Sequence, residues 1–324
     1  MALAAFSRTR TFMKTLALLY DAAGHDRKVD DLDKVDPSSL GPEQLLWVDV
    51  SEFDDGQLHG LPPHLPMAEV SLEELGNLQI FDDHYRFAIP LHDKQQSQLG
   101  FVVGKTWLLT LSKVRPSFFD DFVEADKGET LKGRMSPTAL TATLLMRQLD
   151  SYRNELALVD TAIDKLDETI LRSREKRTPL GVLAALRRRV AGLRAGLGHQ
   201  RDVIHSLIGP DFFAHVTSAD QPFLVETNRV FERVEDDVAR ARDTIIGSFE
   251  LYASRVAQDT NQLLKALTIA TVVTGIVGAV AGIFGMNFDT PIAHTGLNGF
   301  LLVTGAMLFA SVALLAVAFW RRWI

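Results

Sequence analysis

Residues 266–288 read ALTIATVVTGIVGAVAGIFGMNF and contain no ionisable side chain. As a helix that rises about 1.5 Å per residue, this run would reach roughly 34 Å, enough to cross the hydrocarbon core of a bilayer. A second uncharged run, residues 299–320, follows after a short connection and leads into residues 321–324, RRWI. Two adjacent apolar runs of this length rarely form the core of a water-soluble domain, so the sequence predicts two transmembrane helices.

The charges beside the two runs predict their orientation. Lys265 precedes the first run, Arg321 and Arg322 follow the second, and the connection between the runs has no Lys or Arg. Because basic residues stay on the cytoplasmic side, both termini are predicted to be cytoplasmic, and the loop 288–298 is predicted to face outward. We therefore expect a multi-pass protein of a bacterial-type inner (cytoplasmic) membrane.

The composition excludes several classes of protein. The chain has 324 residues, no cysteine, and 34 Lys and Arg against 41 Asp and Glu, for a formal net charge of −7. Without cysteine there is no disulfide framework, thiolate metal site or cysteine nucleophile. The mild negative charge argues against a nucleic-acid partner. No phosphate-binding glycine loop, nucleophile elbow or catalytic carboxylate pair stands out, so we expect no enzyme.

The patterning predicts three regions. Residues 1–135 resemble an α/β domain, because short apolar runs alternate with turn residues. Residues 136–262 are helical, with two long amphipathic helices, a break at a Gly-Pro pair, and a third helix that has no stop before the first membrane span. Residues 263–324 form the two-helix transmembrane domain. Strands are expected at Lys14–Tyr20, Leu45–Val50, Tyr85–Pro90, Leu99–Val103 and Thr106–Leu111, and helices at about 140–171, 179–208 and 222–285.

The predicted fold class is therefore an α+β cytoplasmic domain with a long α-helical stalk and two transmembrane helices. The stalk helix carries one continuous apolar stripe, which runs from Val230 through Ile245 and Phe249 to Val256. A helix this long with a single apolar stripe needs neighbours, so a symmetric oligomer is expected.

The first membrane span has two unlike faces. One face carries small or weakly polar residues at three- and four-residue steps, and the opposite face is rich in valine and isoleucine, which suits lipid or the second span. Two interpretations of the small face remain equally open: tight helix packing through Gly278-xxx-Gly282, or the lining of a narrow pore in a symmetric oligomer. The small face comprises Leu264, Thr268, Thr271, Gly275, Gly278, Gly282 and Gly285.

The end of the first span carries a motif, Gly285-Met286-Asn287. A tripeptide alone is weak evidence, but this one stands at the outer end of the first of two C-terminal spans, after a very long helix. In this arrangement the chain resembles the CorA family of divalent-cation channels and transporters, specifically over about residues 243–287. The positions that match the family's run into its first span are Asn261, Leu264, Lys265, Leu267 and Thr268.

The resemblance implies a homopentamer with a funnel-shaped cytoplasmic domain, which transports divalent metal cations through a central pore. Gly285, Met286 and Asn287 would form the selectivity filter, in which Asn287 meets the hydrated ion. Glu250 would fall at a regulatory metal site between subunits. The resemblance places Asn261, Leu264, Leu267, Gly275 and Gly278 on the pore, and the helix periodicity adds Thr268, Thr271 and Gly282.

Magnesium is the expected ion, both as the transported cation and as a regulatory ligand, with cobalt, nickel or zinc as alternatives. Magnesium sheds water reluctantly, and a ring of neutral Asn287 carbonyl oxygens could accept hydrogen bonds from its intact water shell. The expected partners are further copies of the chain, the lipid membrane and divalent cations. A zinc transporter of the same superfamily and a non-transporting membrane scaffold that retains the fold are the competing hypotheses.

Several positions depart from the family pattern. The motif is followed by residues 289–293, DTPIA, in place of the family's Met-Pro-Glu. Asp289 could replace the outer acidic ring or be an ordinary solvated residue of the outer loop. Gly275 stands where relatives carry a bulky gate, so Leu264 and Leu267 are the better candidates for a dewetting constriction.

Residues 172–201 are basic, whereas the corresponding helical hairpin of the family is often acidic. Three interpretations are open: a solvated face, contact with anionic lipid headgroups, or pairing with acidic residues of the stalk helix. The candidate acidic residues are Glu226, Glu232, Glu235, Asp236 and Asp237.

Overall fold

The computed structural model describes residues 13–53, 70, 72–91, 97–124, 131–172, 179–286 and 296–320. Its contacts divide the chain into two compact units. One unit consists of residues 1–165 and 181–246, and the other of residues 166–180 and 247–324. The long helix α5 (Gln221–Gly285) contributes to both.

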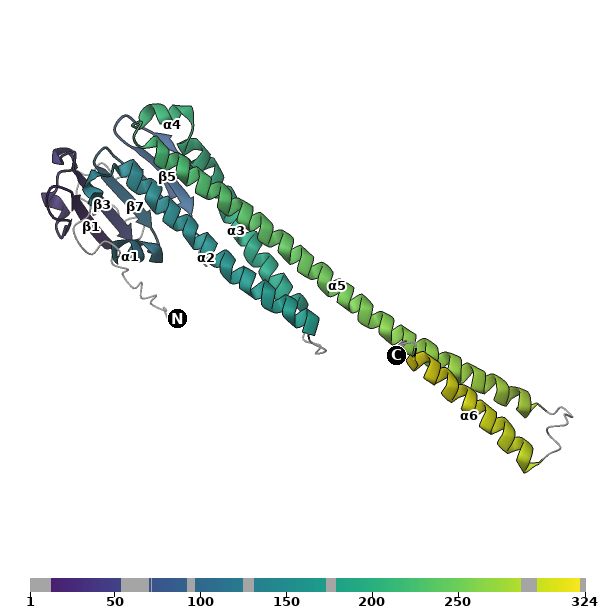
Figure 1. Ribbon diagram of the computed structural model, residues 1–324. Helices are drawn as coiled ribbons and strands as arrows, with labels where there is room; N and C mark the ends of the chain where they lie inside the picture. The colour runs from purple at the N-terminus through teal and green to yellow at the C-terminus, as the bar shows by residue number, and fades with distance from the viewer. Residues whose placement is uncertain are drawn as a thin grey trace, which may run out of the picture. The chain divides into compact units, whose positions relative to one another are not determined.

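The first unit contains a seven-stranded sheet in the order β2-β1-β3-β7-β6-β5-β4 (Figure 1). Neighbouring strands are antiparallel except β3 and β7, which are parallel. Strands β3, β6 and β7 are buried almost throughout, which explains their continuous apolar sequences. The strands are β1 (Lys14–Asp21), β2 (Arg27–Lys28), β3 (Gln44–Ser51), β4 (Gln79–Ile80), β5 (Tyr85–Pro90), β6 (Gln98–Val103) and β7 (Trp107–Ser112).

All five predicted strands are confirmed to within a residue at either end, and β6 and β7 form the antiparallel pair expected around Gly104-Lys105. The strands β2 and β4 were not predicted, because two residues are too short to show an alternating pattern. The short 3-10 helices are Leu32–Lys34, Pro37–Ser39, Leu72–Glu74 and Leu131–Arg134.

The two faces of the sheet bury different side chains, because successive residues of a strand point to opposite faces. One face forms an aliphatic cluster that includes Leu46, Val48 and Val50 of β3. The other face carries Trp47, whose ring meets Phe119 of α1 (Ser117–Glu124) edge to face at 5.3 Å between centroids. This contact holds α1 against the sheet.

The helices α2, α3 and α5 of the first unit form a three-helix bundle. Arg189 of α3 pairs with Glu155 of α2, and Arg201 of α3 pairs with Glu235 of α5 at 2.6 Å. The hydroxyl oxygen of Thr227 on α5 lies 3.4 Å from the Ala142 carbonyl oxygen of α2, so each helix contacts the other two. The helix bounds are α2 (Pro137–Arg172), α3 (Pro179–Leu207), α4 (Pro210–His215) and α5 (Gln221–Gly285).

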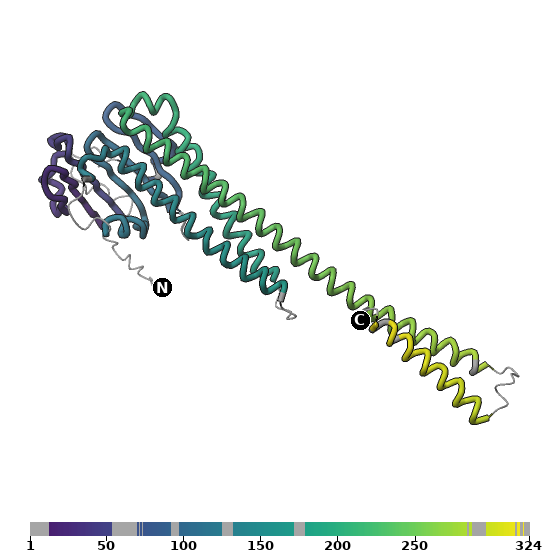
Figure 2. The backbone as a smooth tube through the Cα atoms, viewed as in Figure 1, coloured from purple at the N-terminus to yellow at the C-terminus, as the bar shows by residue number. Residues whose placement is uncertain are grey.

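The three long helices are therefore confirmed, and Figure 2 follows α5 as one helix. The predicted break after α3 is confirmed as well, but the short helix α4 was not foreseen. Pro210 opens α4 at a first-turn position, where its missing N–H costs nothing and its fixed φ suits a helix. The pairing of Arg201 with Glu235 confirms one of the proposed contacts between the basic segment and the stalk.

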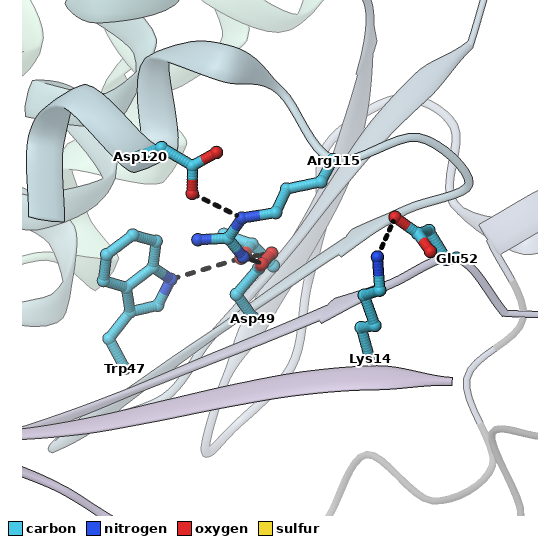
Figure 3. Close-up of polar contacts among 7 residues, drawn as sticks. Lys14, Trp47, Asp49, Glu52, Arg115 and Asp120 are labelled. Atoms are coloured by element: carbon cyan, nitrogen blue, oxygen red, sulfur yellow. Dashed lines mark hydrogen bonds and ion pairs between the residues drawn. The ribbon is translucent and has the colours of Figure 1, made fainter. Parts of the chain in front are cut away.

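A buried ion pair lies between the sheet and α1 (Figure 3). Asp49, in β3 and 1% exposed, accepts a charged hydrogen bond from Arg115, which also donates to Asp120 at 2.9 Å. The Thr110 hydroxyl donates to Asp49 at 2.8 Å and accepts from the Trp47 ring N–H at 3.2 Å. Burial raises the pKa of Asp49 to about 6, and the Arg115 guanidinium opposes that rise.

Replacing Arg115 by methionine is expected to lower stability by about 3 to 5 kcal/mol at pH 8, because it leaves Asp49 buried, charged and without its cation. The folded-state pKa of Asp49 already exceeds its ordinary 3.8, so the folded state takes up a proton as the pH falls through about 6. The cost of Arg115→Met should therefore shrink at pH 5. Thermal unfolding of the detergent-solubilised wild type and variant measures this loss of stability at both pH values.

The double variant Asp49→Asn/Arg115→Met is the matched control, because it removes both charges and should show no pH dependence between pH 5 and 8. Arg134→Met, which breaks an exposed pair with Glu43 (59% and 44% exposed), should cost at most about 0.5 kcal/mol. If Arg115→Met costs the same stability at pH 5 and at pH 8, the variant does not leave the Asp49 carboxylate buried and charged at the higher pH.

Candidate functional site

Two helices of the described chain are long and apolar enough to cross a membrane. They are the C-terminal part of α5 and the helix α6 (Leu297–Trp320). Only 6% of the apolar window of each helix is buried. A core helix of a soluble protein would be mostly buried, so the low burial fits the predicted membrane spans.

The helices α5 and α6 lie side by side in the second unit (Figures 1 and 2). Ile269 of α5 is 8% exposed, and Val273 and Val280 of the same face are partly covered. On α6 four covered residues stand at four-residue steps, namely Gly299, Val303, Met307 and Ser311, and Ala313 and Leu314 are partly covered as well. Part of the valine- and isoleucine-rich face of α5 therefore packs against α6. The sequence predicted either lipid or the second span against this face, and the second span is what the structure shows for this part.

The small face of α5 makes no such contact. A Cβ atom added at Gly275, Gly278, Gly282 or Gly285 would meet nothing within 4 Å outside the local helix. These glycines therefore do not serve a close approach of α6 to α5. Among the residues that the structure describes, these glycines do not pack against another helix of the same chain, so helix packing between copies and a pore both remain open.

The threonines of this span bond to their own helix. Thr268 donates its hydroxyl hydrogen to the carbonyl of Leu264 at 2.8 Å, and Thr271 donates to the carbonyl of Leu267 at 2.9 Å. Each hydroxyl has one hydrogen and two lone pairs, so the oxygen keeps acceptor capacity after this donation. The small face thus offers hydrogen-bond acceptors without a formal charge, which suits water molecules whose hydrogens point outward, as around a cation.

The N-terminal end of this face is also exposed. Asn261 is exposed, and the side chains of Leu264 and Leu267 are 55% and 63% exposed. At the other end α5 stops at Gly285, and Met286 is 56% exposed. Asn287 and Asp289 lie outside the described residues, so their places in the filter and the outer loop remain sequence predictions.

The apolar stripe of the stalk changes character along α5. It is buried in the bundle as far as Ile245, which is 6% exposed. Beyond this residue, Phe249 is 52% and Val256 is 44% exposed. Exposed large apolar side chains that continue a buried stripe mark a surface for further helices, which agrees with the expected oligomer.

Glu250 is exposed, and among the residues that the structure describes no three His, Asp or Glu side chains are grouped to hold a metal ion. The described part of the chain therefore supplies no further carboxylate or histidine cluster with Glu250, and its regulatory role stays a sequence prediction.

Comparison with known proteins identifies the family of this chain. The family model for the CorA-like Mg²⁺ transporter protein matches residues 42–322, which is most of the chain. The chain belongs to the CorA family. The recognition made from the motif and its position is thereby confirmed, and it extends well beyond the membrane spans.

Three relatives illustrate the CorA likeness. The Cobalt/magnesium transport protein CorA of Thermotoga maritima is 24% identical over 244 residues, or 72% of this chain and 68% of the relative. The protein of the same name from Methanocaldococcus jannaschii is 22% identical over 306 residues, or 90% and 95% of the two chains. The complete structure of the CorA magnesium transporter from Methanocaldococcus jannaschii has a TM-score of 0.71 and 20% identity, and covers 95% of this chain and 99% of that one.

The CorA-like fold confirms the α+β domain, the long helix and the two apolar C-terminal helices. The symmetric oligomer is consistent with this family but stays a prediction. The grouping of the small face as a pore lining stays a prediction, since its described members are exposed on α5 but so is most of the span. The acceptor character of the threonines was missed, although threonines at 268, 271 and 274 in a span without competing donors were the available signal.

Proposed function

We propose that this CorA-family protein transports divalent metal cations across the cytoplasmic membrane, through a pore lined by α5 of each subunit in a homopentamer. Magnesium is the proposed ion, with cobalt or nickel as further substrates. The observation that carries the proposal is the exposed, uncharged face of α5, which presents acceptor oxygens and glycines and is not used to pack α6.

Such a face suits a hydrated magnesium ion. The ion keeps its first water shell because it dehydrates reluctantly, and the hydrogens of that shell point away from the metal. Threonine oxygens can accept those hydrogens, and glycines leave room for the shell. Since the face has no charge, it would not hold the ion too tightly to release it. A negative membrane interior would favour entry by about 2.3 kcal/mol per unit charge per 100 mV.

Two further parts complete the proposed pore. Leu264 and Leu267, exposed at its cytoplasmic end, would form a hydrophobic ring that closes by dewetting. At the outer end, the Asn287 side chains would form a collar of amide oxygens, following the family motif. Both termini would be cytoplasmic, as the distribution of Lys and Arg indicates.

Ion flux into proteoliposomes, measured metal by metal with the purified chain, tests the proposal. Magnesium flux driven by membrane potential, without need for a pH gradient, is expected. Zinc flux that requires a pH gradient would favour the zinc transporter of the same superfamily. A chain that assembles in the bilayer but passes none of these ions would contradict transport and favour the scaffold.

A regulatory role of Glu250 gives a separate prediction. If Glu250 binds magnesium with ligands of a neighbouring subunit, magnesium should slow proteolysis of the stalk in the wild type. Glu250→Lys places a cation at the same point and should remove that protection. Limited proteolysis with and without magnesium measures the effect. Arg242→Lys, an exposed position on the same helix that keeps its charge, is the control, and equal protection of wild type and Glu250→Lys would count against the site.

A further inference from the structure

The interface between α2 and α3 contains two buried glutamines whose hydrogen-bonding capacity the protein does not satisfy. Gln148 of α2 and Gln200 of α3 are each 1% exposed. The amide nitrogen and oxygen of Gln148 and the amide oxygen of Gln200 have no hydrogen-bond partner among the residues that the structure describes. Buried polar side chains of folded proteins nearly always have such a partner, either a protein group or an ordered water molecule. These three atoms therefore indicate a partner that is not a protein group.

The orientation of the Gln200 amide is determined by its nitrogen. Nε2 donates to the carbonyl oxygen of Pro90, at the end of β5, at 2.8 Å and to the hydroxyl oxygen of Tyr152 at 3.1 Å. A carbonyl oxygen can only accept, so turning the amide over would place two acceptors against each other at Pro90. Gln200 thus uses both amide hydrogens on β5 and α2, and its oxygen Oε1 is the atom that has no partner.

The two amides lie on the facing sides of α2 and α3. Tyr152 of α2 contacts α3 through Gln200, and it lies against Gly196, where an added Cβ would be 2.6 Å from the Tyr152 hydroxyl oxygen. Gln148 stands four residues before Tyr152, so the two side chains leave α2 on the same face, about 40° apart around the helix. Since this face packs on α3, Gln148 is directed toward α3 as well.

The two amides also lie at similar heights along the antiparallel helices. The Tyr152–Gln200 bond places Gln148 level with the residue four positions after Gln200. The Glu155–Arg189 ion pair, whose side chains are longer, gives the residue four positions before Gln200 instead. Gln200 lies midway, so with either register its height differs from that of Gln148 by four residues, or about 6 Å. Two glutamine side chains with water between them can span such a separation.

The chemistry of the three atoms favours water as the ligand. They present one amide nitrogen that donates and two amide oxygens that accept, so their partner must both accept and donate hydrogen bonds. Water does both, and buried water molecules typically make about three hydrogen bonds to such groups. An ion is unfavourable, because an ion without a counter-charge is costly to bury among apolar residues. The buried neighbours of the two glutamines along α2 and α3 are Leu145, Leu149, Val203 and Ile204.

We propose that ordered water is bound between Gln148 and Gln200, where it accepts a hydrogen bond from the Gln148 amide N–H and donates to the two amide oxygens. Through the nitrogen of Gln200, this water site connects α2 and α3 to the Pro90 carbonyl at the end of β5. The site thus joins the helical bundle to the sheet by hydrogen bonds. All its residues belong to the first unit, so the proposal does not depend on the transported ion.

A density map of the full chain, at a resolution that shows ordered water, tests the site directly. A water peak is expected within hydrogen-bond distance of the Gln148 amide nitrogen and of the Gln200 amide oxygen. A map without a peak between the two glutamines would overturn the proposal. A map in which the two amides bond directly to each other, or in which Gln148 bonds to another protein group, would overturn it as well.

Replacing each glutamine by leucine provides the second test. In the wild-type background, Gln148→Leu removes partners of the water and leaves the Gln200 oxygen buried without one. In the Gln200→Leu background that oxygen is already absent, so Gln148→Leu should lower the unfolding midpoint by at least about 3 °C less than in the wild type. Thermal unfolding of the detergent-solubilised chain measures both shifts, and an equal shift in the two backgrounds would overturn the shared site.

Asn154→Leu is the matched control, because Asn154 is an exposed amide of the same helix. Its effect on the unfolding midpoint should be the same in the wild-type and Gln200→Leu backgrounds, since an exposed amide is already satisfied by solvent. Leucine is close to glutamine in size, so the variants should fold, and a native circular-dichroism spectrum checks this. The density map of the wild type tests the water site without any variant.

Discussion

Replacing Gly278 by leucine is expected to reduce divalent-cation flux by about tenfold or more, because a bulky apolar side chain in a narrow pore excludes water and the hydrated ion. The subunit itself should tolerate the change, since a Cβ at Gly278 meets no atom within 4 Å beyond the local helix. Flux into proteoliposomes measures the loss, and native mass measures assembly.

Val272→Leu is the matched control for this variant. Val272 lies on the same span, is 44% exposed and belongs to the opposite, valine-rich face. Its replacement should leave both flux and assembly nearly unchanged. If Gly278→Leu dissociates the oligomer, the small face is a packing surface between copies. If Gly278→Leu changes neither flux nor assembly, the small face does not line the pore.

Replacing Asn287 by alanine is expected to reduce magnesium flux by at least about tenfold, because the collar would lose the amide oxygens that accept hydrogen bonds from the water shell of the ion. Selectivity for magnesium over monovalent cations should fall as well, since that collar is the proposed filter. Uptake of magnesium and of a monovalent cation, measured with the same vesicles, checks both effects.

Asp289→Asn is the companion variant, two residues further along the chain. It removes a charge from the outer loop and keeps the proposed amide collar intact. A small effect would identify Asp289 as an ordinary loop residue. A loss equal to that of Asn287→Ala would assign the attraction of the ion to a ring of loop carboxylates, and unchanged flux in Asn287→Ala would contradict the filter.

The long elements could be predicted from the sequence because their signals are local. No proline interrupts α5 after its first turn, and its apolar stripe continues through Gly247, where one glycine is tolerated inside a long helix. The order of the strands could not be predicted, since the parallel pairing of β3 with β7 joins segments more than fifty residues apart. The ion pair of Asp49 with Arg115 could not be predicted for the same reason, because the two residues meet only in the folded sheet.

The candidate site was predictable in part. Helix periodicity separates the small face of α5 from the valine-rich face. The resemblance to the family supplies the predicted filter residues, Gly285, Met286 and Asn287. Periodicity could not decide whether Gly278 served a close approach to α6, because that depends on how α6 is rotated against α5. The space around the glycines settles this question within the chain.

We propose that the small face of α5 borders water inside a bilayer-spanning assembly. Cysteine accessibility tests it most directly, since the chain has no native cysteine. In proteoliposomes, Thr271→Cys should react readily with a water-soluble, membrane-impermeant thiol reagent, and the reaction should block flux. Val272→Cys, on the valine-rich face, should react slowly. Equal protection of both cysteines in an assembled, transporting protein would contradict the account.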